Sequence, residues 1–214
     1  MSDAPVDYTE VRSAAELREI LGSPSERAAN KDRHVLHEMD RKWIASSPFV
    51  LVATSDAEGR CDVSPKGDPA GFVHVLDERT LAIPERPGNR RADGFHNILA
   101  NPHVGLIFII PGRTDSLRIN GRARIVREAP FFDAMSVGGH RPKLAVIVEI
   151  EQLFFHCSKA FMRSELWTPE SWRPEAMPSR AQVVKAMEPT DKSLEELEAY
   201  YGSAYAGKLY READ

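Results

Sequence analysis

The spacing of hydrophobic positions changes near residue 48 of this 214-residue chain. Before that point apolar residues recur every three or four positions, which is the spacing of an amphipathic helix. Ser13 and Glu16 have the arrangement of a capping box, and Gly22 is a helix-stop signal. The apolar stripe of the second helix consists of Val35, Leu36, Met39, Trp43 and Ile44. We therefore predict two N-terminal helices, the first starting after Ser13 and the second running from Pro24 to about Ser46.

After residue 48, short apolar runs alternate with turn residues, which is the pattern of strands joined by hairpins. The predicted strands cover residues 49–54, 60–64, 72–76, 80–83, 104–110, 116–127 and 144–156. Short helices are predicted at 91–100 and 130–137, and Ser193 and Glu196 form a capping box for a final helix. Because few helices separate the strands, we predict a mainly β fold, an antiparallel barrel or sandwich with flanking helices.

Composition and charge exclude several classes of protein. The chain is 42% hydrophobic and 28% charged, as in globular proteins, and its net charge of -4 disfavours nucleic acid as a partner. The sequence has no run of about 18 apolar residues, so no membrane-spanning helix is predicted. The N-terminus lacks the pattern of a secretory signal. The cysteine usage makes a reducing cytoplasm the expected location. Cys61 and Cys157 form no CxxC pair, so neither a zinc site nor a disulfide framework is predicted.

The segment from Ile83 to Arg91 has the features of a phosphate site. It leaves a predicted strand, turns through Pro87 and Gly88, and enters a predicted helix. N–H groups at a helix start bind anions, and guanidinium groups such as that of Arg90 match phosphate geometry. The alternative is that Asn89 or Asp93 caps the helix and the arginines are solvated.

Two further segments can line a ligand. In residues 62–72, the backbone near Ser64 and Pro65 can pair with the edge of a planar ring, and Lys66 can place a positive charge beside it. The alternative is a sharp turn between strands. On the predicted strand 116–127, polar residues at alternate positions share one face, which suits either a ligand groove or a solvent-facing surface.

Other candidate clusters favour structural roles. His34, His37, Glu38 and Asp40 lie close together in sequence, but the HExxH spacing is absent, so we predict a solvated helical face and no metal site. His156 and Cys157 are neighbours on a predicted strand and point to opposite faces, so they do not form a catalytic pair. No general base is evident, and the catalytic residues stay unknown.

Taken together, these segments resemble the FMN-binding split-barrel family of pyridoxamine 5′-phosphate oxidase, and in particular its stand-alone bacterial flavoproteins. The resemblance extends from about Leu17 to Trp167. It is carried by residues 47–49, 62–68, 71–73, 83–84, 88–91, 97–102, 117–123, 155–160 and 163–167. Each stretch is short, and their order and spacing make the resemblance specific. It implies a six-stranded antiparallel split β-barrel that forms a homodimer, with FMN at the subunit interface.

The resemblance also implies which residues hold FMN. The flavin ring and ribityl chain would be lined by Val63, Ser64, Pro65 and Lys66, with backbone contacts from Ile83 and Pro84. The phosphate would be held by Asn89, Arg90 and Arg91. Ser116 occupies the position of a ring-contacting glutamine, with Arg118 near it on the same face. Arg163 and Trp167 would reach a flavin from the partner subunit.

Two departures from the oxidase concern the substrate. Cys61 stands where the oxidase has an arginine, and the C-terminal arginine motif that binds its substrate is not recognisable. Oxidation of vitamin B6 is therefore not predicted.

The resemblance implies an FMN-dependent oxidoreductase that transfers hydride or electrons through flavin N5, with a small-molecule substrate or NAD(P)H as the donor. The alternatives are a non-catalytic protein that binds or buffers FMN, and a split barrel that binds deazaflavin or haem. The expected domains are an N-terminal helical segment over 1–46, a split-barrel domain over 47–160, and an irregular and helical extension over 161–214 that packs on the barrel.

Overall fold

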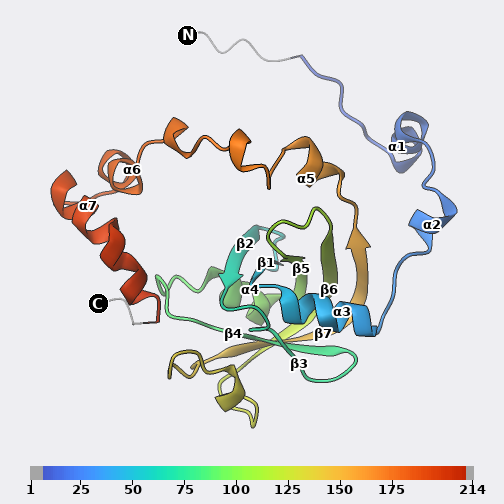
Figure 1. Cartoon of the computed structure of the whole chain (residues 1–214). Coiled ribbons are helices and arrows are strands. Elements are labelled where there is room, and N and C mark those ends of the chain that lie inside the picture. Colours follow the sequence, from blue (N-terminus) through green and yellow to red (C-terminus); the bar gives the residue numbers. More distant parts are fainter. Residues whose placement is uncertain (1–6, 211–214) are drawn as a thin grey trace. The chain divides into compact units, whose positions relative to one another are not determined.

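The computed structural model describes residues 7–210 (Figure 1). The described chain divides into two compact units, with the boundary between Asp32 and Arg33. The first unit holds the helices α1 (Ala14–Leu21) and α2 (Glu26–Ala29). Ser13 caps α1 by accepting a hydrogen bond from the N–H of Glu16 at 3.1 Å, as predicted. Ser25 caps α2 in the same way.

The single helix predicted from Pro24 to Ser46 is wrong. After α2 the chain leaves the helical conformation over residues 31–37, and a separate helix, α3, covers Glu38–Ser46. Between them Arg33 pairs with Leu153, each donating its N–H to the carbonyl of the other at 3.0 and 2.8 Å. This pairing with a residue 120 positions away holds the backbone out of a helical conformation.

The solvated helical face predicted for His34, His37, Glu38 and Asp40 is confirmed only in part, because His34, His37 and Glu38 are exposed whereas Asp40 is buried. His34 precedes α3, and its Nδ1 lies 2.6 Å from the carbonyl oxygen of Glu151. The Asp40 side chain is fully buried and accepts a hydrogen bond from Arg33 Nη2 at 2.8 Å. Asp40 also accepts the N–H of His37, which starts α3. The acidic residue therefore joins the helix start to the segment before it.

The second unit is built on one antiparallel sheet, which confirms the predicted mainly β fold with flanking helices. The sheet has seven strands rather than six, in the order β2-β1-β5-β6-β7-β4-β3. The extra strand is short, because β3 has only two residues. The strands are β1 (Phe49–Ser55), β2 (Cys61–Gly67), β3 (His74–Val75), β4 (Thr80–Pro84), β5 (His103–Ile109), β6 (Ser116–Val126) and β7 (Ala145–His156).

The main core lies on one face of the sheet, and at β4 and β7 the opposite face is buried as well. Alternate residues of β1, β5 and β6 are buried, as the period of a strand requires. The largest fully buried side chains of this core include Phe108, Leu106, Leu117, Ile119 and Ile44 of α3. A second cluster forms where Phe132 and Met135 pack on Ala82, Ala145 and Ile147. The helix predicted over 130–137 is a single 3-10 turn, Asp133–Met135.

The helix α4 (Asp93–Ala100) lies between β4 and β5 along the chain and contacts β1, β2 and β6. Three further helices follow the sheet: α5 (Lys159–Arg163), α6 (Arg180–Met187) and α7 (Leu194–Tyr201). The capping box predicted for Ser193 and Glu196 is confirmed at the start of α7. Three 3-10 turns, Pro169–Ser171, Pro174–Ala176 and Ser203–Lys208, complete the described elements. Among residues 7–210, no helix has the length and apolar character needed to cross a membrane.

Candidate functional site

A cavity of about 260 Å³ lies where β2, the end of β4 and the start of α4 meet. The predicted segments 62–66 and 83–91 come together here, although they are far apart along the sheet order. Eight of the predicted cofactor-binding residues line this cavity: Val63, Ser64, Pro65, Lys66, Ile83, Pro84, Asn89 and Arg91.

The strand β2 forms one wall. It is the last strand of the sheet and pairs only with β1 in the described sheet, so its outer backbone groups are not used in a strand ladder. An edge strand tolerates Pro65, which has no N–H to donate. The predicted strand ended at Ser64, whereas β2 continues to Gly67, so residues 62–67 are strand and the turn follows them at residues 69–71. Ser64 Oγ donates to Asp62 Oδ2 at 2.8 Å and fixes that carboxylate at the wall.

The start of α4 forms the opposite wall, and no side chain caps it among the residues described. The N-cap is Ala92 in the left-handed region at φ 58°, so the alternative in which Asn89 or Asp93 caps the helix is wrong. Asn89 Oδ1 instead accepts the N–H of Arg91 at 3.1 Å. Arg90 also has positive φ, at 62°. The loop therefore turns sharply into a helix start that side chains leave open to a ligand.

Charged side chains on both walls are paired. Lys66 Nζ forms an ion pair with Glu85 and lies 5.3 Å from the centroid of the Phe95 ring. Arg91 Nε donates to Asp93 Oδ2 at 2.8 Å. This hydrogen bond raises the pKa of Arg91 and lowers the pKa of Asp93, so both groups are charged at neutral pH.

The structure places the other predicted residues outside this cavity. Arg90 lines a neighbouring cavity. Ser116 is buried opposite His156 in the β6–β7 ladder. Arg118 is exposed, with its guanidinium carbon 5.4 Å from the centroid of the Phe154 ring. Arg163 is exposed at the end of α5.

Trp167 also lies outside the cavity, at the end of the segment that follows α5. Its Nε1 donates to the carbonyl of Arg113 at 2.7 Å, and its ring stacks with that of Phe161. Within one chain, Trp167 therefore fixes the segment after β7 against the turn before β6.

Residues that the sequence analysis did not assign to a site also line the cavity. Thr54 is buried and accepts a hydrogen bond from Asn97 Nδ2 at 3.0 Å. Phe95 and Ile98 line the cavity from α4. Residues three positions apart lie on the same face of a helix. This spacing could have indicated that the helix packs its apolar face beside segments 62–66 and 83–91.

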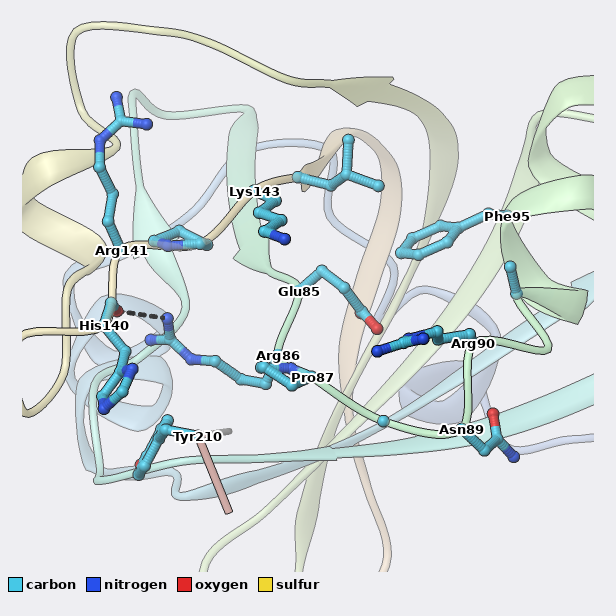
Figure 2. Close-up of a pocket in the computed structure, with 14 residues that line it drawn as sticks. Glu85, Arg86, Pro87, Asn89, Arg90, Phe95, His140, Arg141, Lys143 and Tyr210 are labelled. Atoms are coloured by element: carbon cyan, nitrogen blue, oxygen red, sulfur yellow. Dashed lines mark hydrogen bonds between the residues drawn. The ribbon is translucent and has the colours of Figure 1, made fainter. Parts of the chain in front are cut away.

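A second cavity, of about 510 Å³, adjoins the first and shares Glu85, Asn89, Ala92 and Phe95 with it. Figure 2 shows the side chains that surround it. Its other walls come from residues 86–90, from the loop 140–144 and from Tyr210 near the C-terminus.

The sequence profile of the family described as pyridoxamine 5′-phosphate oxidase matches residues 36–157. No curated protein sequence matches the chain.

Several solved structures are similar to the chain. A putative pyridoxamine 5′-phosphate oxidase from Lactobacillus delbrueckii is 24% identical, with 57% of this chain and 95% of that chain covered and a TM-score of 0.45. An FMN-binding protein from Syntrophomonas wolfei is 11% identical, with 56% and 89% covered and a TM-score of 0.41. The heme storage protein HutZ from Vibrio cholerae is 14% identical, with 56% and 93% covered and a TM-score of 0.40.

Proposed function

Because this chain belongs to the pyridoxamine 5′-phosphate oxidase family, we propose that it is an FMN-binding flavoprotein that exchanges hydride or electrons with a small-molecule substrate or NAD(P)H. One observation carries the proposal. The two segments that the sequence assigns to the flavin ring and to the phosphate, 63–66 and 83–91, line the same cavity. Neither segment forms such a site alone.

The residues present fit FMN. The start of α4 has no side-chain cap among the described residues, and Arg91 stands beside it, which suits a phosphate dianion. Arg90 borders the same loop from the neighbouring cavity. The edge strand β2 offers backbone groups to the polar edge of the ring. Bound FMN supplies an N5 atom that accepts or gives a hydride.

The charge of Lys66 gives this chain a means of tuning the flavin. A positive charge near the N1–C2=O edge of the ring stabilises the reduced anion. Lys66 is paired with Glu85, so the ring would experience a partly compensated charge. Lys66 and Glu85 together would set the reduction potential more than they set the affinity.

We also propose that the protein is a homodimer, and the exposed face of the sheet supports this. Pro65, Leu51, Ile107 and Arg118 are successive register partners across β2, β1, β5 and β6, so they form one row on this face. In the next row Val63 is 57% exposed. Three of the four residues in this row are apolar, as is common in protein interfaces, and we propose that a second copy of the chain covers it.

The size of the cavity points to the same conclusion. Pockets that enclose a small ligand measure roughly 300–1,000 Å³, whereas the cavity at β2 measures about 260 Å³. One chain would therefore enclose FMN only in part, and the partner would cover the rest. Arg118, in the same row as Pro65, would then lie at the interface beside the flavin.

The absorbance spectrum of the purified protein tests the cofactor. The proposal predicts the two visible and near-ultraviolet bands of a flavin. An intense Soret band, or a deazaflavin spectrum without FMN, would contradict it.

Anaerobic mixing with NADH or NADPH then separates an enzyme from a protein that only binds FMN. Loss of flavin colour, with recovery in air, is the result expected for an oxidoreductase. Persistent colour with both donors would favour the binding protein.

A further inference from the structure

Tyr210, at the C-terminal end of the described residues, contacts three segments of the second unit. Its hydroxyl donates a hydrogen bond to Asp68, 142 positions away, just after β2. Its ring stacks on that of His140 in the loop before β7, with centroids 5.6 Å apart. The guanidinium carbon of Arg86, just after β4, lies 5.9 Å from the centroid of the same ring. Figure 2 shows the rings of Tyr210 and His140 beside the Arg86 side chain, so distant segments meet at this point.

Asp68 is the buried acceptor at the centre of these contacts. Its side chain is 1% exposed, and its Oδ2 accepts a hydrogen bond from Arg86 Nε at 2.5 Å. Its Oδ1 accepts the hydrogen bond from the Tyr210 hydroxyl. A buried carboxylate is stable only where it is paired and hydrogen-bonded. Tyr210 therefore completes the buried pair that holds Arg86 in place.

The contacts of Tyr210 are available at neutral pH. The hydrogen bond to Asp68, together with partial burial, raises the pKa of Tyr210, so the hydroxyl stays protonated and donates. A guanidinium group this close to an aromatic ring is also attracted to the face of the ring.

Arg86 is the first residue of the loop 86–91, which leads from β4 to α4. Its guanidinium group also donates to the carbonyls of Met135 and His140. Beyond Arg86 the loop has little packing of its own, because residues 87–91 are exposed. Arg90 has positive φ, a backbone conformation that is costly for a residue other than glycine. The conformation of the loop therefore depends on the point at which it is anchored.

We propose that Tyr210 is a positioning residue for the loop 86–91, which it holds through Asp68 and Arg86 in the conformation that receives the phosphate of FMN. The effect on FMN rests on the proposed function, whereas the hold on the loop does not. A loop that is already in its binding conformation binds more tightly, because the ligand does not have to order it. The family profile ends at residue 157, so this contribution comes from the part of the chain beyond it.

Titration of the apoprotein with FMN and with riboflavin, which lacks the phosphate, tests this role. In the Tyr210→Ala protein the preference for FMN should fall about tenfold, as expected if the loop is in its binding conformation about a tenth of the time. Riboflavin affinity should be nearly unchanged, since riboflavin has no phosphate for the loop to hold. A residue that only stabilised the fold would lower both affinities alike. Tyr210→Phe keeps the ring and loses the hydroxyl, so it should retain part of the preference.

Limited digestion of the apoprotein with trypsin measures the hold on the loop without any flavin. Trypsin cleaves after arginine, and Arg90 and Arg91 lie in the loop. Cleavage of a folded protein follows the population of locally opened conformations. The Tyr210→Ala protein should therefore be cut after these two arginines several-fold faster than the unaltered protein, as measured by mass spectrometry of the fragments.

Tyr205→Ala is the matched control. Tyr205 lies in the same C-terminal segment, its ring contacts those of Tyr200 and Tyr201, and it lines neither cavity. Its replacement should leave the preference for FMN and the rate of cleavage unchanged. Equal cleavage of the Tyr210→Ala and Tyr205→Ala proteins, or an equal preference for FMN, would overturn the inference.

The two measurements also separate this inference from the proposed function. FMN binding by the unaltered protein, with a preference that Tyr210→Ala leaves unchanged, would refute the inference alone. No flavin binding by any of these proteins, together with faster cleavage of the Tyr210→Ala protein, would refute the proposed function and support the hold of Tyr210 on the loop.

Discussion

Arg86 and Asp68 form a buried ion pair, with Arg86 Nε 2.5 Å from Asp68 Oδ2 and the Asp68 side chain 1% exposed. Arg86 also donates to the carbonyls of Met135 and His140, at 2.7 and 3.4 Å. One guanidinium group thus joins the end of β2, the 3-10 turn after β6 and the loop before β7. The segment that carries Asn89 and Arg91 starts from this anchor.

Arg86→Met should destabilise the protein by about 3 kcal/mol, because it leaves the Asp68 carboxylate buried without its ionic partner. Urea denaturation followed by circular dichroism measures the change in the free energy of unfolding. Arg60→Met is the control, since the pair of Arg60 with Asp56 lies at the surface and its loss should leave stability nearly unchanged. Equal effects of the two replacements would mean that the buried pair does not stabilise the fold.

Replacing either member of the Lys66–Glu85 pair should shift the flavin reduction potential, in opposite directions. Lys66→Met removes a positive charge and should lower the potential, whereas Glu85→Gln leaves Lys66 uncompensated and should raise it. Shifts of about 10–30 mV are expected, since about 30 mV corresponds to ~1.4 kcal/mol for a two-electron couple. Spectroelectrochemical titration gives both values. Shifts of the same sign, or no shift, would show that this ion pair does not set the reduction potential of the flavin.

If the protein forms the proposed homodimer, Ile107→Asp should convert it into monomers and lower the affinity for FMN. Ile107 lies in the exposed row between Leu51 and Arg118, and a charge there would be buried without a partner in the dimer. Sedimentation velocity measures the oligomeric state. Met187→Asp is the control, because Met187 is 78% exposed on α6 and lies far along the chain from this row. A dimer that survives Ile107→Asp would place the interface elsewhere.

Stability should fall as the pH drops below about 6.5, in part through His74. Burial, with a further contribution from the charge of Arg86, lowers the pKa of His74 from its ordinary value of 6.5. As the pH falls, the unfolded chain therefore takes up a proton at this position before the folded chain does, and unfolding is favoured.

The His74→Gln variant checks this pH dependence. Urea denaturation at about pH 7.5 and about pH 5.5 should show a smaller loss of stability in the variant than in the unaltered protein. The same loss in both proteins would assign the pH dependence to other groups.

Local patterns predicted most of the sheet, because the alternation of buried and exposed residues is a property of each strand alone. The helix expected over 24–46 failed for a non-local reason, the pairing of Arg33 with Leu153. The helix α6 was missed although its signal was present. Ser179 and Gln182 form a reciprocal capping box at its start, within a segment whose prolines suggested irregular structure.

The candidate site, like the fold, could be predicted from the sequence only where local residues specify it. Lys66 and Arg91 each lie in a segment whose polar residues identified it as a candidate ligand site. The structure brings both segments to one cavity. The contact of Tyr210 with Asp68 could not be predicted, since nothing in the local sequence around either residue specifies a partner 142 positions away. Tyr210 lines the second cavity, so that part of its wall was not foreseen.

The phosphate contacts of the loop 89–91 can be measured by titrating the apoprotein with FMN and with riboflavin, which lacks the phosphate. Each charge-assisted contact contributes about 1.5–3 kcal/mol, so the unaltered protein should bind FMN at least about 100-fold more tightly than riboflavin. In the Arg90→Ala/Arg91→Ala protein this preference should largely disappear, while riboflavin affinity and the dimer are retained. An FMN affinity unchanged by the double replacement would show that the phosphate is not bound at this loop.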